Sequence, residues 1–294
     1  MKPYFLPLLL LPILSGCSNA SGTKAATTAD SARPGTSAQA ASTPDSLSGD
    51  QPKPPKEDTA ALNLRLALES TLSANQTNIS IPPFGLDKVM ADIRRMKFVD
   101  DPNGGDDFSI ALSDSIYDSL SFDEKFTYNM IHAEDYSQMC DALPEHADEQ
   151  NRIYGLTVAF FGEYSWSKRQ LSFFNDNRDS IEQLMKRVID RQGRIGMNFL
   201  YVIARNNSTD MIPYLIDFDR KDNSNHYVLT TLMLLMKEND CPEFEQSISY
   251  KKLYGNEREM TAYAVYLTYN KANEDLIIQR ATNFYNTREG APKP

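Results

Sequence analysis

Histidine, cysteine and clustered acidic residues are the side chains of this sequence that could do chemistry. The chain contains three histidines and three cysteines. His132, Cys140 and His146 lie near one another in the sequence, and these are residue types that zinc prefers as ligands. No two of them have the i, i+4 spacing that places both ligands on one helix face. We therefore expect no metal site among them.

Two acidic segments have some likeness to calcium sites. Asp217 and Asp219 have the spacing of the first two ligands in an EF-hand loop. The sixth position is Asp222 where that loop needs glycine, and the twelfth is Val228 where it needs glutamate, so an EF-hand is excluded. Residues 100–107 offer several carboxylates to a loosely bound calcium ion, and a solvated turn is the simpler interpretation.

Motifs of the common enzyme classes are missing from the sequence. It contains no G-x-S-x-G elbow, phosphate-binding P-loop, H-E-x-x-H metal motif or dinucleotide-binding fingerprint. Acidic residues are too numerous for any pair to be identified as a glycosidase-like couple. The sequence favours a protein that is not an enzyme, and we expect no cofactor.

The N-terminal residues resemble those of bacterial lipoproteins. Residues 4–13 form a short apolar run, whereas a membrane-spanning helix needs roughly 20 apolar residues, so residues 1–16 are interpreted as a signal peptide. Leu14-Ser15-Gly16-Cys17 follows directly and matches the lipobox of that family. The resemblance implies that Cys17 is lipidated and that the mature chain is anchored in a bacterial cell envelope without spanning a membrane. Because Ser18 replaces the aspartate that retains enteric relatives in the inner membrane, we favour the outer membrane.

A composition change divides the rest of the chain. Residues 17–58 are mostly Ala, Ser, Thr, Gly and Pro, and Leu47 is their only large aliphatic side chain. Such a segment buries too little apolar surface to offset its ordering entropy, so we expect a disordered linker after the lipidated cysteine. Residues 59–290 are expected to form the folded domain, and residues 291–294 a tail.

Apolar periodicity in the folded domain predicts helices. Ile181, Leu184, Met185, Val188 and Ile189 follow helical spacing, and Gly193 lies where a helix C-cap is expected. Ser121 and Glu124 have the spacing of a capping box that opens another helix. The same reasoning predicts helices over about 121–133, 150–164, 197–204, 212–216, 228–236, 244–253, 260–269 and 276–285.

One stretch of the domain resembles a HEAT-type helical repeat. Ile181 and Leu184 are each followed, 31 residues later, by Ile212 and Leu215. Residues 211–235 have a proline early in the first helix and a leucine-rich second helix, although Leu229 stands where the family has arginine. The resemblance implies an all-α fold of stacked antiparallel helix pairs, similar to an α-solenoid and forming a single elongated domain.

The two remaining cysteines and a group of tyrosines are further candidates. An oxidising compartment permits a disulfide between Cys140 and Cys241, and two separately buried thiols are the alternative. Tyr263, Tyr266 and Tyr269 recur with helical spacing. Core packing is the simpler account of these tyrosines, and an exposed stripe that binds a peptide or a sugar is the alternative.

Charge and anchoring together suggest three functions. The net charge is −10 at pH 7, which disfavours binding to nucleic acid and favours a basic protein or peptide partner through electrostatic steering. Our leading hypothesis is a lipid-anchored envelope protein with a non-enzymatic binding or scaffold domain. The alternatives are an inhibitor or immunity protein that neutralises a cationic toxin or hydrolase, and an envelope enzyme that uses carboxylates in a groove.

Overall fold

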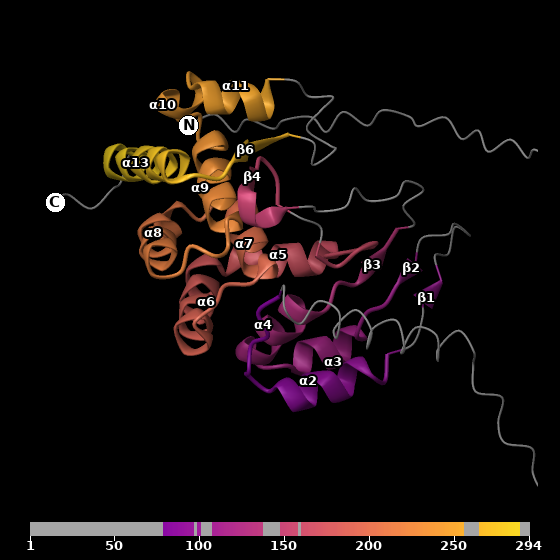
Figure 1. The fold of residues 1–294 in the computed structure, drawn as a ribbon. Coiled ribbons are helices and arrows are strands. Elements are labelled where there is room, and N and C mark those ends of the chain that lie inside the picture. Colours follow the sequence, from indigo (N-terminus) through magenta and orange to yellow (C-terminus); the bar gives the residue numbers. More distant parts are fainter. Residues whose placement is uncertain are drawn as a thin grey trace, which may run out of the picture. The chain divides into compact units, whose positions relative to one another are not determined.

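The computed structural model describes residues 79–96, 99–100, 108–137, 148–157, 160–255 and 265–288, all within the unit Pro54–Pro294. These residues are mostly helical, as predicted (Figure 1). The signal peptide, Cys17, the linker and the C-terminal tail lie outside the described residues, as do Cys140 and Tyr263.

Helices and short strands are interspersed along the chain. The helices are α2 (Leu86–Ile93), α3 (Asp114–Ser119), α4 (Phe122–Ile131), α5 (Lys168–Asp176), α6 (Arg178–Gln192), α7 (Met197–Arg205), α8 (Ile212–Lys221), α9 (Tyr227–Lys237), α10 (Pro242–Glu245), α11 (Ile248–Tyr254) and α13 (Lys271–Thr287), with 3₁₀ turns η1 (Glu149–Asn151) and η2 (Thr209–Met211). The strands are β1 (Val99–Asp100), β2 (Phe108–Ser109), β3 (Asp135–Tyr136), β4 (Arg152–Tyr154), β5 (Tyr164–Ser165) and β6 (Tyr266–Thr268).

Helix α6 confirms the clearest sequence prediction. Its buried face includes Ile181, Leu184 and Val188, which follow the expected helical spacing. Gly193 ends the helix with φ 66°, a left-handed conformation that glycine adopts without a steric penalty. Local sequence therefore determines both the inward face of α6 and its end.

The capping box at the start of α4 is also confirmed. The Ser121 hydroxyl accepts a hydrogen bond from the Glu124 backbone N–H, and the Glu124 carboxylate accepts one from the Ser121 N–H. This exchange satisfies two of the backbone donors that every helix leaves free at its first turn.

Helices α8 and α9 form where the repeat-like stretch predicts a pair. Pro213 lies in the first turn of α8, where its missing N–H would have no partner inside the helix. Helix α9 is buried along most of its length, and it contacts α7, α8, α10 and α13. It is therefore the central helix of this part of the fold (Figure 1).

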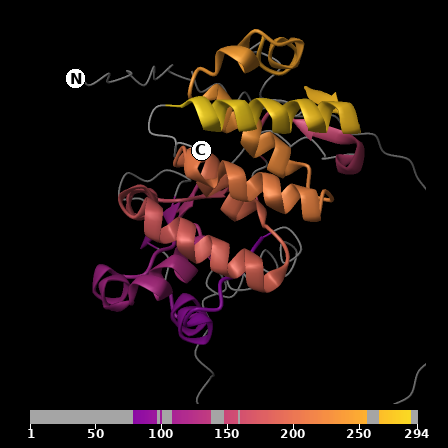
Figure 2. The same cartoon turned by 90° about the vertical axis from the view of Figure 1, so that its left-hand side faces the viewer.

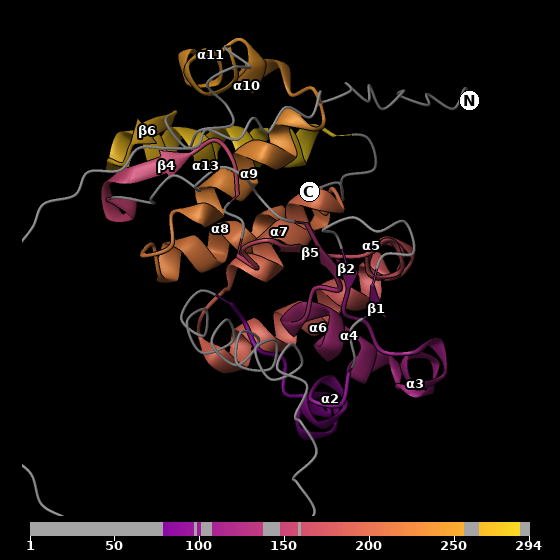
Figure 3. The same cartoon turned by 90° about the vertical axis from the view of Figure 1, so that its right-hand side faces the viewer.

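The helix predicted over residues 150–164 is wrong. This region instead contains η1, strand β4 and the start of β5. Strand β4 pairs antiparallel with β6, with Ile153 opposite Leu267 (Figure 3). The apolar and aromatic residues of this segment suit a pleated strand, and pairing with a segment more than 100 residues away overrides the local helical pattern.

Two more predicted helices need correction. The helix expected over 260–269 is wrong at residues 266–268, which form β6. The helix expected over 244–253 is divided into α10 and α11, because the Ser247 hydroxyl accepts a hydrogen bond from the Tyr250 N–H and starts a new helix. A serine that caps a helix favours a boundary over a helix interior.

Two apolar clusters hold the described residues together. The larger one extends from α4 to α13 and includes Phe126, Trp166, Phe199 and Leu232. The smaller one lies between α2, α3 and the other side of α4 and includes Val89 and Tyr128. Strands β1, β2, β3 and β5 form a small antiparallel sheet in that order.

None of the described helices is long and apolar enough to cross a membrane.

Candidate functional site

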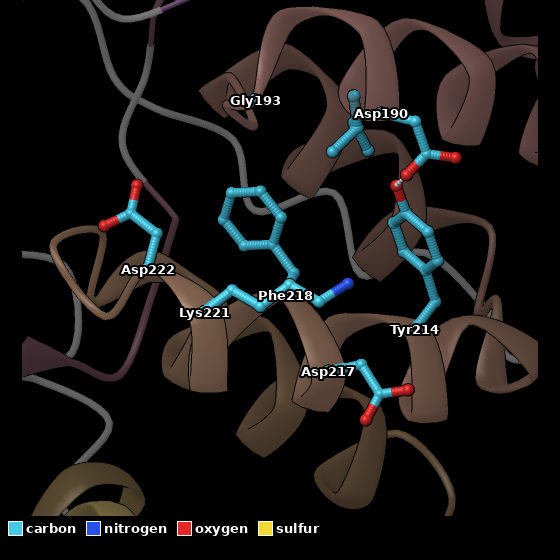
Figure 4. A pocket seen from close by; sticks show the side chains of 8 residues that line it. Asp190, Gly193, Tyr214, Asp217, Phe218, Lys221 and Asp222 are labelled. Carbon is cyan, nitrogen blue, oxygen red and sulfur yellow. Dashed lines mark hydrogen bonds between the residues drawn. The ribbon is translucent and has the colours of Figure 1, made fainter.

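A pocket of about 370 Å³ lies between α6 and α8 (Figure 4). Its lining combines apolar, aromatic and charged side chains from the two helices and the residues that follow each of them: Ile189, Asp190, Gly193, Tyr214, Asp217, Phe218, Lys221 and Asp222. This volume lies near the lower end of the range of about 300–1,000 Å³ that is common for small-molecule sites.

The periodicity of α8 positions most of the pocket. Tyr214, Asp217, Phe218 and Lys221 follow the spacing i, i+3, i+4 and i+7, so they lie along one face of the helix. The last turn of α6 supplies Asp190 opposite them. Two helices that the core holds rigidly therefore bring these side chains together.

Tyr214 and Asp190 connect the two walls of the pocket. The Tyr214 hydroxyl donates a hydrogen bond to Asp190 Oδ1 at 2.8 Å, as Figure 4 shows. Burial raises the pKa of Tyr214, and the bond to the Asp190 carboxylate raises it further, so the phenol stays protonated at neutral pH. Lys186 Nζ lies 5.8 Å from the centre of the Tyr214 ring. The ring of Tyr214 already contacts one cation in this structure.

The lining of the pocket contains more carboxylates than ammonium groups. Asp190, Asp217 and Asp222 contribute three carboxylates and Lys221 one ammonium group, and two further cations lie beside the lining, Lys186 at the Tyr214 ring and Arg220 at Asp217. Asp217 and Lys221 are exposed, and Arg220 lies 3.4 Å from Asp217 as a surface ion pair. An exposed pair of this kind contributes little and exchanges easily with another cation. The arrangement can hold a guanidinium or ammonium group between carboxylates and aromatic rings.

Two tyrosines of the predicted stripe, Tyr266 and Tyr269, lie on and just after strand β6, and Tyr263 lies outside the described residues. The Arg152 guanidinium lies 4.2 Å from the centre of the Tyr266 ring, and Lys252 Nζ lies 5.7 Å from it. Tyr269 stacks on His226 with ring centres 3.7 Å apart. Because successive residues of a strand point to opposite faces, Tyr266 and Tyr269 do not form one helical surface. Whether they bind a ligand stays a prediction.

The candidate residues Cys241 and His132 are each buried. Cys241 is buried and unbonded, and its predicted disulfide partner Cys140 lies outside the described residues. His132 is buried, its Nε2 lies 2.6 Å from the Ile110 carbonyl oxygen, and burial lowers its pKa. Within the described ranges no three His, Cys, Asp or Glu side chains are placed to hold a metal ion.

A second polar cluster surrounds the buried carboxylate of Glu134, which is 1% exposed. Arg169 Nε lies 3.0 Å and 2.9 Å from its two oxygens, and the Tyr128 hydroxyl donates to Oε1 at 2.7 Å. The Ser167 hydroxyl donates to the other oxygen. Both oxygens are thus occupied by protein groups. We interpret this cluster as a structural connection between α4, β3 and α5.

The pocket was not predicted from the sequence, although part of its signal was present. The spacing of Tyr214, Asp217, Phe218 and Lys221 marks a mixed aromatic and charged helix face. Asp190 is 24 residues before Tyr214, and only the packing of α6 on α8 brings the two together.

Comparison with known protein families, with curated proteins and with solved structures finds no match for this chain.

Proposed function

We propose that this protein is a lipid-anchored component of a bacterial envelope whose helical domain binds a basic protein or peptide. The observation that carries the proposal is the pocket between α6 and α8. Three carboxylates and the aromatic rings of Tyr214 and Phe218 share its lining, and one of the carboxylates, that of Asp190, accepts the hydrogen bond of the Tyr214 hydroxyl. Anionic and aromatic groups together favour a guanidinium or ammonium side chain over neutral or acidic ones.

The charge of the whole chain supports the same partner class. A net charge of −10 attracts basic proteins over distances of about a Debye length, roughly 8–10 Å at physiological ionic strength. Long-range attraction of this kind increases the rate of encounter, whereas the pocket supplies short-range specificity. Binding should therefore weaken as salt is added.

We also propose that α6 to α9 are two stacked helix pairs of a solenoid-like domain. Two asparagines that follow α7 and α9, 32 residues apart, support this arrangement. Asn207 Nδ2 donates to Asn239 Oδ1 at 3.0 Å, and Asn239 Nδ2 donates back to Asn207 Oδ1 at 2.6 Å. In Figure 2, α13 in yellow, α8 in orange and α6 in salmon follow one another as successive layers. Equivalent residues of successive pairs meet in this way when repeats stack.

The anchoring part of the proposal depends on Cys17. Two acyl chains give stable membrane attachment where one chain alone binds reversibly. The full chain should partition into the detergent phase when it is expressed in bacteria, and the variant Cys17→Ser should stay in the aqueous phase. Intact-mass measurement that finds an unmodified Cys17 thiol would contradict this part.

The binding part is tested by capturing partners from envelope extract with the full chain. We expect a basic protein to be retained at low salt and lost at high salt. The triple variant Asp190→Asn, Asp217→Asn and Asp222→Asn should lose it.

The matched control removes three exposed carboxylates elsewhere, with Asp118→Asn, Asp176→Asn and Asp179→Asn. This control has the same net charge as the pocket variant and should retain the partner. If both triple variants lose the partner equally, net charge alone would explain binding and the pocket would have no special role.

A further inference from the structure

The contact between α8 and α13 has different charges at its two ends. At one end the Arg288 guanidinium contacts the Asp210 carboxylate, so opposite charges meet. At the other end Asp219 of α8 and Glu274 of α13 are both buried where the two helices pack, close enough for their charges to interact with each other and with Lys271. Like charges that are removed from water repel each other strongly.

Asp219 is buried without a partner among the described residues. It is 1% exposed, and neither of its carboxylate oxygens has a hydrogen-bond partner there. A buried ionised carboxylate is normally paired or hydrogen-bonded, because transfer from water is otherwise costly. The position therefore requires something that neutralises the charge.

Glu274 already has its own partners. It is 2% exposed, and its two oxygens accept hydrogen bonds from the Tyr269 hydroxyl at 2.8 Å and from Lys271 Nζ at 2.6 Å. Lys271 is exposed and also lies 3.0 Å from Asp275. The Lys271 ammonium group is thus shared between two other carboxylates, and it makes no hydrogen bond to Asp219.

The other groups around Asp219 do not neutralise it. Asp222, at the end of the same helix, adds a further negative charge. At the start of α9, His226 stacks on Tyr269, and the Tyr227 hydroxyl donates to Glu149.

Three charged groups lie further away along the elements that pack against α8. Asp210 of η2 is paired with Arg288 at the far end of the contact. Arg280 lies six residues beyond Glu274 on α13, about 9 Å along the helix, and makes no hydrogen bond to Asp219. Lys237, at the end of α9, is paired with Glu238.

We infer that Asp219 holds a proton while α13 is packed on α8, and that loss of this proton loosens the start of α13. The proton passes to solvent when the contact opens. The carboxylate that remains then repels Glu274 until it is hydrated. The pair is thus a pH-sensitive connection between the last long helix and the rest of the fold.

The electrostatics of the site agree with this inference. Burial, and secondarily the charge of Glu274, raise the pKa of Asp219 from 3.8 to about 6. The folded chain therefore binds a proton between about pH 4 and pH 6 that the unfolded chain releases. Because the unfolded state binds fewer protons there, the contribution of Asp219 to stability falls as pH rises through this window and is constant above it.

The test compares full chains with and without the titrating group. Asp219→Asn imitates the protonated form, and Asp217→Asn removes a charge from the exposed side of the same helix as the control. Between pH 4.5 and pH 7.5 the unfolding constant of the wild type should rise on the order of 25-fold relative to that of Asp219→Asn, from the two pKa values above. The unfolding constant of Asp217→Asn should change with pH in the same way as that of the wild type.

Three results would overturn the inference. The first is an unfolding constant that changes with pH in the same way for the wild type and for Asp219→Asn. The second is calcium chloride stabilising the wild type at pH 7.5 but not Asp219→Asn, because a cation rather than a proton would then occupy the pair. If Asp219→Asn does not fold, amide hydrogen exchange of the wild type tests the inference instead. The amides of Glu274 to Ile278 should lose protection relative to α6 between pH 4.5 and pH 7.5, and unchanged relative protection is the third contrary result.

Discussion

Replacing Arg169 with methionine should destabilise the fold more than any surface substitution. The single Nε–H of Arg169 is shared between both oxygens of the buried Glu134 carboxylate, Nη2 donates to the same carboxylate, and Nη2 also donates to the Leu112 carbonyl at 2.7 Å. The substitution keeps most of the apolar stem and removes the charge. Glu134 is then left buried and without its main counter-charge.

The expected cost follows from which of these contacts are buried. The contact from Arg169 to Asp114 contributes little, since the Asp114 side chain is almost fully exposed. Removing one partner of a buried ion pair costs about 3–5 kcal/mol, because the other charge stays uncompensated. At roughly 2–4 °C per kcal/mol for a domain of this size, the melting temperature should fall by at least about 6 °C.

Urea unfolding and thermal melting of the full chain measure this effect. Lys168→Met is the matched control, because Lys168 is exposed and precedes Arg169 in the same helix, so its loss should stay within about 0.5 kcal/mol. Adding Glu134→Gln to Arg169→Met should recover part of the stability by removing the stranded charge. A loss below about 1 kcal/mol for Arg169→Met would refute the reasoning.

Three further substitutions test other parts of the structure. Ser121→Ala removes the α4 capping box and should cost about 1 kcal/mol in urea unfolding, whereas an unchanged midpoint would contradict the cap. Gly196→Ala would place a Cβ 2.0 Å from the Ser80 backbone nitrogen, so a loss of about 1–3 kcal/mol is expected, and full stability would mean that residues 79–81 do not pack there. Burial lowers the pKa of His132, so the contribution of this residue to stability should be lost as pH falls below about 6.5, where the unfolded chain gains a proton; relative to the wild type, His132→Gln should become more stable as pH falls, and parallel stability profiles of the two proteins would exclude the mechanism.

Most of the features that were predicted from the sequence depend on neighbouring residues, although the helix boundary at Ser247, which is also local, was missed. The apolar face of α6, the Gly193 cap and the Ser121 box each depend on a few adjacent positions. Strand β4 was missed because its partner β6 lies far along the chain. The pocket was missed for the same reason, since Asp190 and Tyr214 belong to different helices.

The most direct test of the proposed function is isothermal titration of the full chain with an arginine hexapeptide. The wild type should bind in a salt-dependent manner. The variant with asparagine at 190, 217 and 222 should bind about tenfold more weakly, which corresponds to about 1.4 kcal/mol, and the variant with asparagine at 118, 176 and 179 should bind within about twofold of the wild type. Equal weakening of both variants, or binding that does not depend on the pocket carboxylates, would contradict the account.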